Sequence, residues 1–222
     1  MDFFQAMESR MSCRSFKERT VDRQTLERLL RAANQSPSYM NTQPWEVFVA
    51  AGERKKALSR KLYEAITSAQ PMQPYIPFQR QWPDPIELRA LTHRNSRFRA
   101  LGIDPEKDQD KVRESYLRNF LFFDAPCALF IGMDGSLPAW SIFDLGLFTH
   151  GLLLAAHASG LGACPQAMPT AYPELIRDVL GIPENIAIVL TISLGYPDSE
   201  APVNRYRSVR RGIGEFVHWI GC

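Results

Sequence analysis

The chain has 222 residues, of which 45% are hydrophobic, enough to bury the core of one large domain. Its 26 Lys and Arg residues nearly balance its 24 Asp and Glu residues, so the formal net charge is only +2. This balance argues against nucleic acid or an anionic membrane surface as a partner recognised through overall charge. We predict a single domain over residues 1–222 whose ligands are recognised locally.

The cysteine content and the N-terminus indicate a reducing compartment. The chain has four cysteines without the spacing that is typical of zinc sites and disulfide frameworks, namely Cys13, Cys127, Cys164 and Cys222. The first residues lack the basic start and the apolar run of a secretory signal. The apolar stretch 145–161 contains two histidines and falls short of the roughly 20 apolar residues that a membrane span needs. We therefore predict a cytoplasmic protein with reduced thiols, no metal site and no membrane span.

Hydrophobic periodicity predicts two short helices at the start of the chain. Phe3, Phe4 and Met7 recur at helical spacing. The same spacing recurs over residues 26–33, where Asp22 is a candidate N-cap. Three β-type runs follow at residues 45–50, 126–133 and 186–194.

Two further helices are predicted between the last two of these runs. The longer and more apolar one is capped by Ser136, has Pro138 near its first turn and ends at Gly160 and Gly162. The shorter one spans residues 173–180 and ends before a glycine. The alternation of helices and strands predicts a mixed fold whose sheet is covered on both faces.

Residues 70–100 interrupt this pattern with five prolines followed by an arginine-rich stretch. Such a segment is typical of an insertion, either a lid over a binding site or a solvated surface excursion. As a lid, it would bring aromatic side chains to the ligand from Tyr75, Phe78 and Trp82. It would also bring guanidinium groups able to pair with an acid from Arg94, Arg97 and Arg99.

Three short segments carry candidate ligand-binding chemistry. Residues 9–16 contain two arginines and several hydroxyls, a combination that suits a phosphate at a helix end, although a solvated basic turn has the same composition. Residues 36–45 offer hydroxyl and amide groups around a flat heterocycle, or form a proline-stiffened turn before a strand. Residues 160–168 form a small-residue turn that lets backbone approach a ligand, or a helix C-cap and loop.

Taken in this order, the segments resemble the nitroreductase family of flavoproteins. Residues 10–16 match the family's Arg-rich RRSxRxF-like turn, and residues 36–45 match its APSxxNxQPW-like turn. Residues 160–162 supply its GLG turn, and residues 210–219 its Arg-containing tail. The likeness covers nearly the whole chain, and the block Asn41-Thr42-Gln43-Pro44-Trp45 is its most specific part.

The resemblance implies an α+β fold. It is a three-layer sandwich with a central, mainly antiparallel sheet flanked by helices, and two chains form an intertwined homodimer that exchanges C-terminal tails. The implied cofactor is FMN, with NAD(P)H as the electron donor. The implied phosphate ligands are Arg10, Ser12 and Arg210, and Arg14 would lie near the N1 and O2 edge of the flavin.

Two further groups of residues are implied to contact FMN. The partner subunit would contribute Pro37, Ser38, Asn41 and Gln43, and the loop facing flavin N5 would contain Pro165, Gln166 and Ala167. Two positions depart from the family pattern, because Met11 replaces its second arginine and Ser208 replaces the basic residue two positions before Arg210.

The implied function is hydride transfer from NAD(P)H to nitroaromatic or quinone acceptors by a ping-pong mechanism. No catalytic side chain is required, because the N5 atom of FMN carries the chemistry. Two alternatives stay open, namely reductive dehalogenation of a halophenol on the same scaffold and a flavin-binding module without turnover. We interpret His150 and His157 as structural because no third metal ligand accompanies them. Cys13 lies between two arginines that could lower its pKa, but we interpret it as a packing residue.

Overall fold

The computed structural model describes residues 1–221, and the predicted thiol of Cys222 lies outside this range. The centre of the fold is one sheet in the order β1-β2-β4-β3, in which all neighbouring strands are antiparallel. The strands are β1 (Glu46–Ala51), β2 (Cys127–Asp134), β3 (Gly162–Gln166) and β4 (Ile186–Gly195). The three strands expected from β-type runs are therefore confirmed, as is the antiparallel sheet.

The fourth strand, β3, corrects the prediction of a turn over residues 160–168. The turn is confined to the end of the preceding helix, where Gly160 has a φ of 76°. From Gly162 onward the backbone pairs with β4. Gly162 is required by a close approach, since a Cβ atom there would lie 2.7 Å from the Cys13 side chain. This pairing is non-local, and the local run of small residues did not indicate it.

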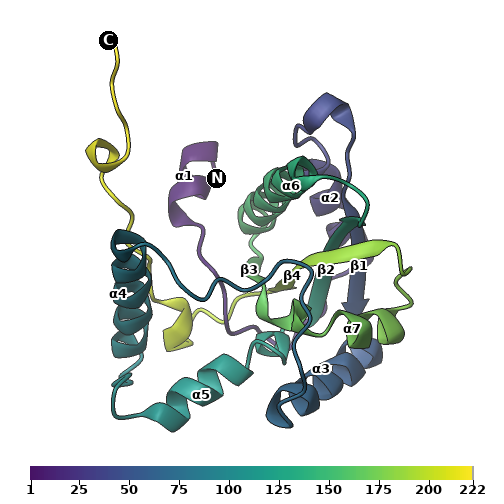
Figure 1. Cartoon of the computed structure of the whole chain (residues 1–222), viewed down its shortest axis with the longest axis horizontal. Coiled ribbons are helices and arrows are strands. Elements are labelled where there is room, and N and C mark those ends of the chain that lie inside the picture. The colour runs from purple at the N-terminus through teal and green to yellow at the C-terminus, as the bar shows by residue number, and fades with distance from the viewer. Residues whose placement is uncertain (222) are drawn as a thin grey trace.

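Helices cover both faces of the sheet, as predicted (Figure 1). They are α1 (Phe3–Ser9), α2 (Arg23–Ala33), α3 (Gly52–Thr67), α4 (Asp84–Ala100), α5 (Gln109–Leu117), α6 (Ala139–Ala158) and α7 (Pro173–Leu180). On one face, side chains such as Leu29 of α2 and Leu152 of α6 form a core with the sheet. On the other face, Leu58 of α3 and Ile176 of α7 form a second core. Helix α3 is not among the predicted elements.

Helix α6 is the central packing element. By length and composition it could cross a membrane, but its Leu145, Phe148 and Leu152 are buried in the core. The ring of Trp45 stacks on Phe148 with a centroid distance of 4.9 Å. The predicted buried helix is confirmed, but its predicted cap is wrong. The Ser136 hydroxyl instead donates to Asp134 and closes the turn after β2, so the helix begins after Pro138.

The chain from the end of α3 through α5 leaves the three layers (Figure 1). Its first part is extended and is fastened to the body where Gln73 N donates to the Ala171 carbonyl at 2.8 Å. Helix α4 follows and buries one side chain, Phe98, whereas α5 buries none. The predicted insertion over 70–100 thus contains an extended arm and α4, and the excursion continues through α5. Its role as a lid stays a prediction.

The C-terminal residues extend away from the body beyond α4 (Figure 1). Val209 is 91% exposed and Ile220 is 90% exposed. Other large apolar side chains at the surface come from α1 and from the start of α6, for example Phe4 at 74% and Trp140 at 65%.

Candidate functional site

Two of the predicted phosphate ligands, Arg10 and Ser12, lie on a segment that is built into the edge of the sheet. Helix α1 ends at Ser9, and the next residues run beside β3, where Ser12 forms a parallel bridge with Ala163. Cys13 N donates to the Ala163 carbonyl at 3.0 Å. Arg10, Ser12 and Arg14 are therefore held on fixed backbone, which contradicts the alternative of a solvated basic turn.

Asn204 joins this segment to the C-terminal tail. Its Oδ1 atom accepts from Arg14 N at 2.8 Å, and its Nδ2 donates to the carbonyls of Ser15 and Asp198, each at 2.8 Å. The side chain is 3% exposed, so these bonds are shielded from water. The tail that follows is thereby brought back over the arginine-rich segment.

The result is a cavity of about 510 Å³, which we call the phosphate cradle. Its lining includes Arg10, Ser12, Arg14 and Arg210, so the structure brings all three predicted phosphate ligands together. The remaining lining residues are Met7, Glu8, Met11, Tyr206, Arg207 and Ser208. Burial and the nearby guanidinium of Arg210 lower the pKa of Arg10. Cations that are crowded in this way favour an anion between them.

Arg207 is a cradle residue that the sequence did not reveal. The family pattern suggested a basic residue two positions before Arg210, where this chain has Ser208. Arg207 lies one position earlier and lines the same cavity, with its Nη1 donating to the Asn204 carbonyl at 2.7 Å. The positive charge missing at position 208 is thus supplied by the neighbouring residue. A basic residue within one position of the expected site was the signal that could have found it.

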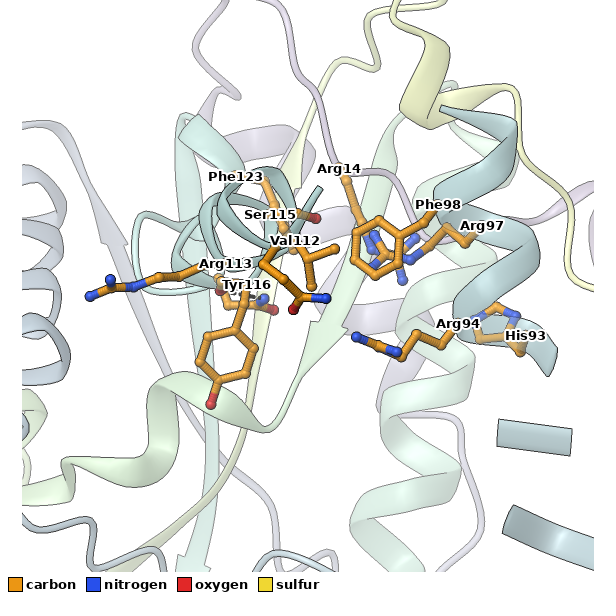
Figure 2. A pocket seen from close by; sticks show the side chains of 12 residues that line it. Arg14, His93, Arg94, Arg97, Phe98, Val112, Arg113, Ser115, Tyr116 and Phe123 are labelled. Carbon is orange, nitrogen blue, oxygen red and sulfur yellow. Dashed lines mark hydrogen bonds between the residues drawn. The ribbon is translucent and has the colours of Figure 1, made fainter. Parts of the chain in front are cut away.

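A second cavity, of about 550 Å³, adjoins the cradle at Arg14, and we call it the α4–α5 cavity (Figure 2). Helix α4 contributes His93, Arg94, Arg97 and Phe98, and α5 contributes Gln109, Val112, Arg113, Ser115 and Tyr116. The remaining wall consists of Arg14, Asn119 and Phe123. Arg14 lines both cavities and so stands at the boundary between the cradle and the α4–α5 cavity.

Asn119, one residue of this wall, is held in place by the side chain of Gln166. The Gln166 Nε2 donates to the Asn119 carbonyl at 3.0 Å, and Ser193 Oγ hydrogen-bonds to the Gln166 side-chain oxygen. Gln166 is 4% exposed, and its carbonyl accepts from Thr191 Oγ1 at 2.9 Å, so the whole residue is internal. Phe123 has a φ of 52°, within a run of three left-handed residues. Such strained backbone concentrates at functional sites.

The other two members of the predicted N5 loop behave differently from Gln166. Pro165 is half-buried, and Ala167 is exposed. Ala167 lines a separate apolar cavity of about 360 Å³, together with Phe78 of the extended arm and side chains of α6. Of the aromatic residues expected in a lid, Phe78 thus lies near this loop, whereas Tyr75 and Trp82 are each 41% exposed.

The predicted partner-subunit residues Pro37, Ser38, Asn41 and Gln43 lie elsewhere. Their loop is fastened to the first half of α6, where Tyr39 N donates to Asp144 at 3.1 Å. The cradle is reached from the other end of the same helix, where His157 contacts Ser9. At 1.5 Å per residue, these positions on α6 are about 20 Å apart. Within one chain, therefore, the structure does not bring this loop to the cradle.

This loop nonetheless has a defined conformation, held by its own hydrogen bonds. Gln43 N donates to Ser38 Oγ at 2.9 Å, and Asn41 and Gln43 have φ values of 57° and 47°. Left-handed backbone at residues other than glycine costs free energy, which the surrounding contacts must offset. Asn41 and Gln43 are exposed, so their polar groups face outward.

Cys13 is not an activated thiol. Burial raises the pKa of its thiol to about 11, and the opposing effect of Arg14 is the weakest of the contributions. Its side chain is fully buried against Gly162. This agrees with its interpretation as a packing residue.

These observations define the class of protein as an α+β fold with an antiparallel sheet between helical layers and an arginine-rich cradle that opens into a larger cavity. A model described as the nitroreductase family matches residues 7–196, and the chain belongs to this family. The resemblance predicted from the sequence motifs is confirmed.

Several characterised proteins are similar to the chain over nearly its whole length. It is 35% identical to 4-nitrobenzoate reductase of Pseudomonas putida, over 99% of this chain and 96% of that protein. The fold is similar to that of the FMN and NADPH-dependent nitroreductase NfnB from sphigopyxis sp. strain HMH, with a TM-score of 0.94, 28% identity and full coverage of both chains. The FMN-dependent nitroreductase NfnB of Mycobacterium smegmatis, solved with NADPH, has a TM-score of 0.92 at 27% identity, covering 98% of this chain and 97% of that one.

Proposed function

We propose that this protein is an FMN-dependent oxidoreductase that transfers hydride from NAD(P)H to nitroaromatic or quinone acceptors by a ping-pong mechanism. The observation that carries the proposal is the position of Arg14 between the phosphate cradle and the α4–α5 cavity. FMN has a phosphate at one end and a ring at the other, and the two adjoining cavities suit these two ends. The names of the family relatives support the same reaction class.

The residues present fit the cofactor. In the cradle, Arg10, Arg207 and Arg210 supply guanidinium donors and Ser12 a hydroxyl, which together suit a phosphate dianion. Arg14 extends into the neighbouring cavity, where a fixed positive charge stabilises negative charge that develops at the flavin edge. When bound, FMN would supply hydride transfer through its N5 atom between the nicotinamide and the acceptor. The protein binds, orients and supplies charge, and we assign no catalytic side chain.

We further propose that the working unit is a homodimer with exchanged tails. The loop carrying Pro37, Ser38, Asn41 and Gln43 cannot reach the cradle of its own chain but presents its polar groups outward, as a partner's flavin would require. The exposed apolar side chains of α1, α6 and the tail supply the surface for such contact. An obligate interface of this kind buries roughly 2,000 Å² or more.

The spectrum and steady-state kinetics of the purified protein test the proposed reaction. We expect a bound-flavin absorbance band and NAD(P)H oxidation that depends on nitrobenzene or a quinone. Reciprocal plots at several acceptor concentrations should be parallel, as for ping-pong kinetics. A colourless protein that binds no added FMN would overturn the proposal, and intersecting lines would overturn the ping-pong order alone.

Sedimentation analysis tests the dimer. The wild-type chain should sediment as a dimer at micromolar concentration, whereas Phe143→Asp, at a position 59% exposed on α6, should shift it toward monomer and reduce FMN retention. The matched variant Glu18→Ala, on an exposed loop away from the apolar surface, should leave both properties unchanged. A wild-type monomer that retains FMN and turns over would contradict the proposal.

A further inference from the structure

We propose that Arg97 and Arg94 of α4 form a carboxylate-binding subsite in the α4–α5 cavity, so that the preferred acceptors are compact aromatic rings bearing an acid. The inference rests on the proposed function and specifies the class of acceptor. Of the three arginines considered from sequence, the structure places Arg94 and Arg97 in the cavity lining but not Arg99.

The arginine side chains around this cavity point in different directions, and this decides which of them we assign to the subsite (Figure 2). The side chains of Arg14 and Arg97 converge beside the ring of Phe98, and Arg94 points into the space between the helices. The Arg97 guanidinium lies over the Phe98 ring at 4.5 Å from its centroid, which orients the group and limits its motion. Arg113 points away from this group, so we leave it out of the subsite.

The charge in the cavity is uncompensated. No carboxylate side chain is among the residues that line it. Over residues 1–221, neither Arg94 nor Arg97 takes part in an ion pair. Arg97 is half-buried, and burial together with nearby Arg14 lowers its pKa. Guanidinium groups that line one cavity without a counterion favour an incoming anion, and a partly desolvated Arg–carboxylate pair is directional.

The rest of the lining suits an aromatic ring. Phe98, Val112, Tyr116 and Phe123 contribute apolar or aromatic surface from three sides. Arg14, which we assign to the flavin edge, lies within the same wall. A ring held on this surface with its acid toward Arg97 would therefore lie beside the flavin. The cavity of about 550 Å³ is of the size that binds small molecules.

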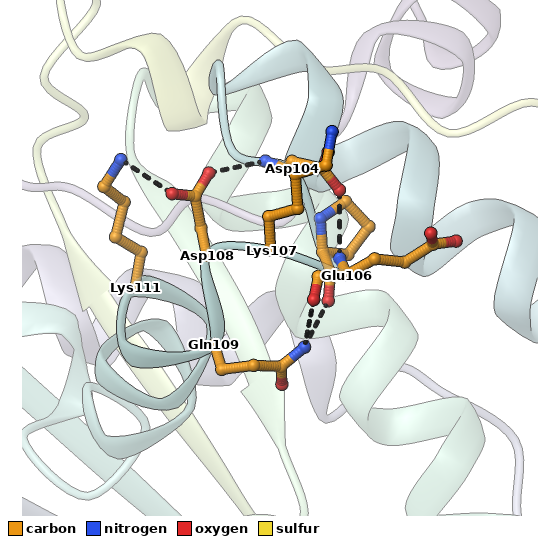
Figure 3. Close-up of polar contacts among 7 residues, drawn as sticks. Asp104, Glu106, Lys107, Asp108, Gln109 and Lys111 are labelled. Atoms are coloured by element: carbon orange, nitrogen blue, oxygen red, sulfur yellow. Dashed lines mark hydrogen bonds and ion pairs between the residues drawn. The ribbon is translucent and has the colours of Figure 1, made fainter.

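The two helices that form the walls are connected by an ordered turn (Figure 3). Asp104 N donates to Asp108 Oδ2 at 2.8 Å, and Glu106 N donates to Asp104 Oδ1 at 3.0 Å. Lys111 pairs with Asp108 at 3.2 Å. On its other side, α4 contacts the tail, where Tyr206 Oη lies 3.2 Å from His93 Nδ1. These contacts hold the arginines of α4 in place against the cavity.

The kinetic test compares 4-nitrobenzoate with its methyl ester, using the flavin-loaded enzyme. The wild type should prefer the acid in kcat/KM. Arg97→Ala should reduce the acid-to-ester ratio by about tenfold to a hundredfold, the loss expected for a charge-assisted hydrogen bond, and Arg94→Ala should reduce it less. Arg99→Ala is the matched control on the same helix and should retain the wild-type ratio. Equal use of acid and ester by the wild type would overturn the subsite.

A binding measurement separates recognition from turnover. Calorimetry with the holoenzyme should give tighter binding of benzoate than of benzamide, and Arg97→Ala should abolish the difference. Arg97→Lys should restore part of it, because a lysine keeps the charge but loses the planar, two-pronged donor geometry. Unchanged benzoate affinity in Arg97→Ala would overturn the proposal.

The phosphates of NAD(P)H are a second kind of anion that Arg94 and Arg97 could bind in place of a carboxylate. If the arginines bind a phosphate of the dinucleotide instead, Arg97→Ala should raise KM for NADPH and leave the acid-to-ester ratio unchanged, which would overturn the proposal. Nitrobenzene, which has no carboxylate, tests the proposed function separately from the subsite. If the wild type and the variants all reduce nitrobenzene, the proposed function is supported even where the acid-to-ester ratio contradicts the subsite. If the flavin-loaded protein reduces no acceptor, the proposed function itself is refuted.

Discussion

The Nε2 atom of His157 lies 2.7 Å from the hydroxyl of Ser9, and this contact joins the end of α6 to the end of α1. The hydroxyl proton of Ser9 is donated to the Gln5 carbonyl, so His157 acts as the donor. Arg10 follows Ser9 directly and lines the phosphate cradle. The contact therefore fixes the backbone from which Arg10, a proposed phosphate ligand, extends. The structural role of His157 is to anchor the end of α1.

We expect His157→Ala to weaken FMN binding by about twofold to tenfold, the effect of losing one neutral hydrogen bond. His157→Gln should retain most of the affinity, because its amide can also donate to Ser9. Fluorescence titration of the apoprotein with FMN measures both variants. Equal losses in the two variants would show that the imidazole acts through packing and not through the hydrogen bond.

Arg210 should contribute directly to FMN affinity. Its side chain lines the cradle, and its charge lowers the pKa of neighbouring Arg10. Arg210→Ala should weaken FMN binding by about tenfold to a hundredfold, because a charge-assisted hydrogen bond to phosphate is lost. Arg211→Ala is the matched control, since this neighbouring guanidinium lies over the Phe216 ring, 5.1 Å from its centroid, and is not part of the cradle lining. Wild-type affinity in Arg210→Ala would remove Arg210 from the phosphate site.

Asn204 should contribute mainly to stability. Asn204→Ala removes three partly buried hydrogen bonds and leaves the Arg14 amide and the Asp198 carbonyl without these partners, whereas the Ser15 carbonyl still accepts from Asp198 N at 3.1 Å. We expect the free energy of unfolding to fall by about 2–4 kcal/mol, measured by urea denaturation. Glu200→Ala in the same turn is the control, because its exposed pairing with Arg205 should contribute at most about 1 kcal/mol. A loss below that of the control would contradict the anchoring role.

The buried thiol of Cys127 should limit stability at alkaline pH. Burial raises its pKa to about 12 from an ordinary value of 9.0. Between these values the folded chain retains a proton that the unfolded chain has lost, so stability falls as pH rises. For one thiol the slope is about 1.4 kcal/mol per pH unit. The effect should be absent below pH 9.

Cys127→Ala should make the decline in unfolding free energy between pH 9 and pH 11 shallower by about that slope, as measured by urea denaturation at each pH. Leu129→Val, at a fully buried position on the same strand, should lower stability by a constant amount across this range. A pH-independent difference between Cys127→Ala and the wild type would contradict the raised pKa.

The elements that the sequence predicted are those with strong local signals. Helix α7 occupies residues 173–180 as predicted and ends at Gly181, which has a φ of 70°. Strands β2 and β4 appear as continuous apolar runs because both faces of the sheet are covered. The cradle residues were found because their motifs are contiguous, with Arg10, Ser12 and Arg14 on one short segment.

The tertiary structure decided the features that depend on contacts between distant residues. Strand β3 exists because its backbone pairs with β4, and its small residues carry no local β signal. Likewise, the side chain of Gln166 is turned inward by Asn119 and Ser193, from two other parts of the chain. Arg97 and Arg99 are equivalent in sequence, but only the side chain of Arg97 enters the cavity. Local periodicity and motifs set which elements form, whereas the position of α4 and α5 on opposite sides of one cavity, next to Arg14, determines which charges share a site.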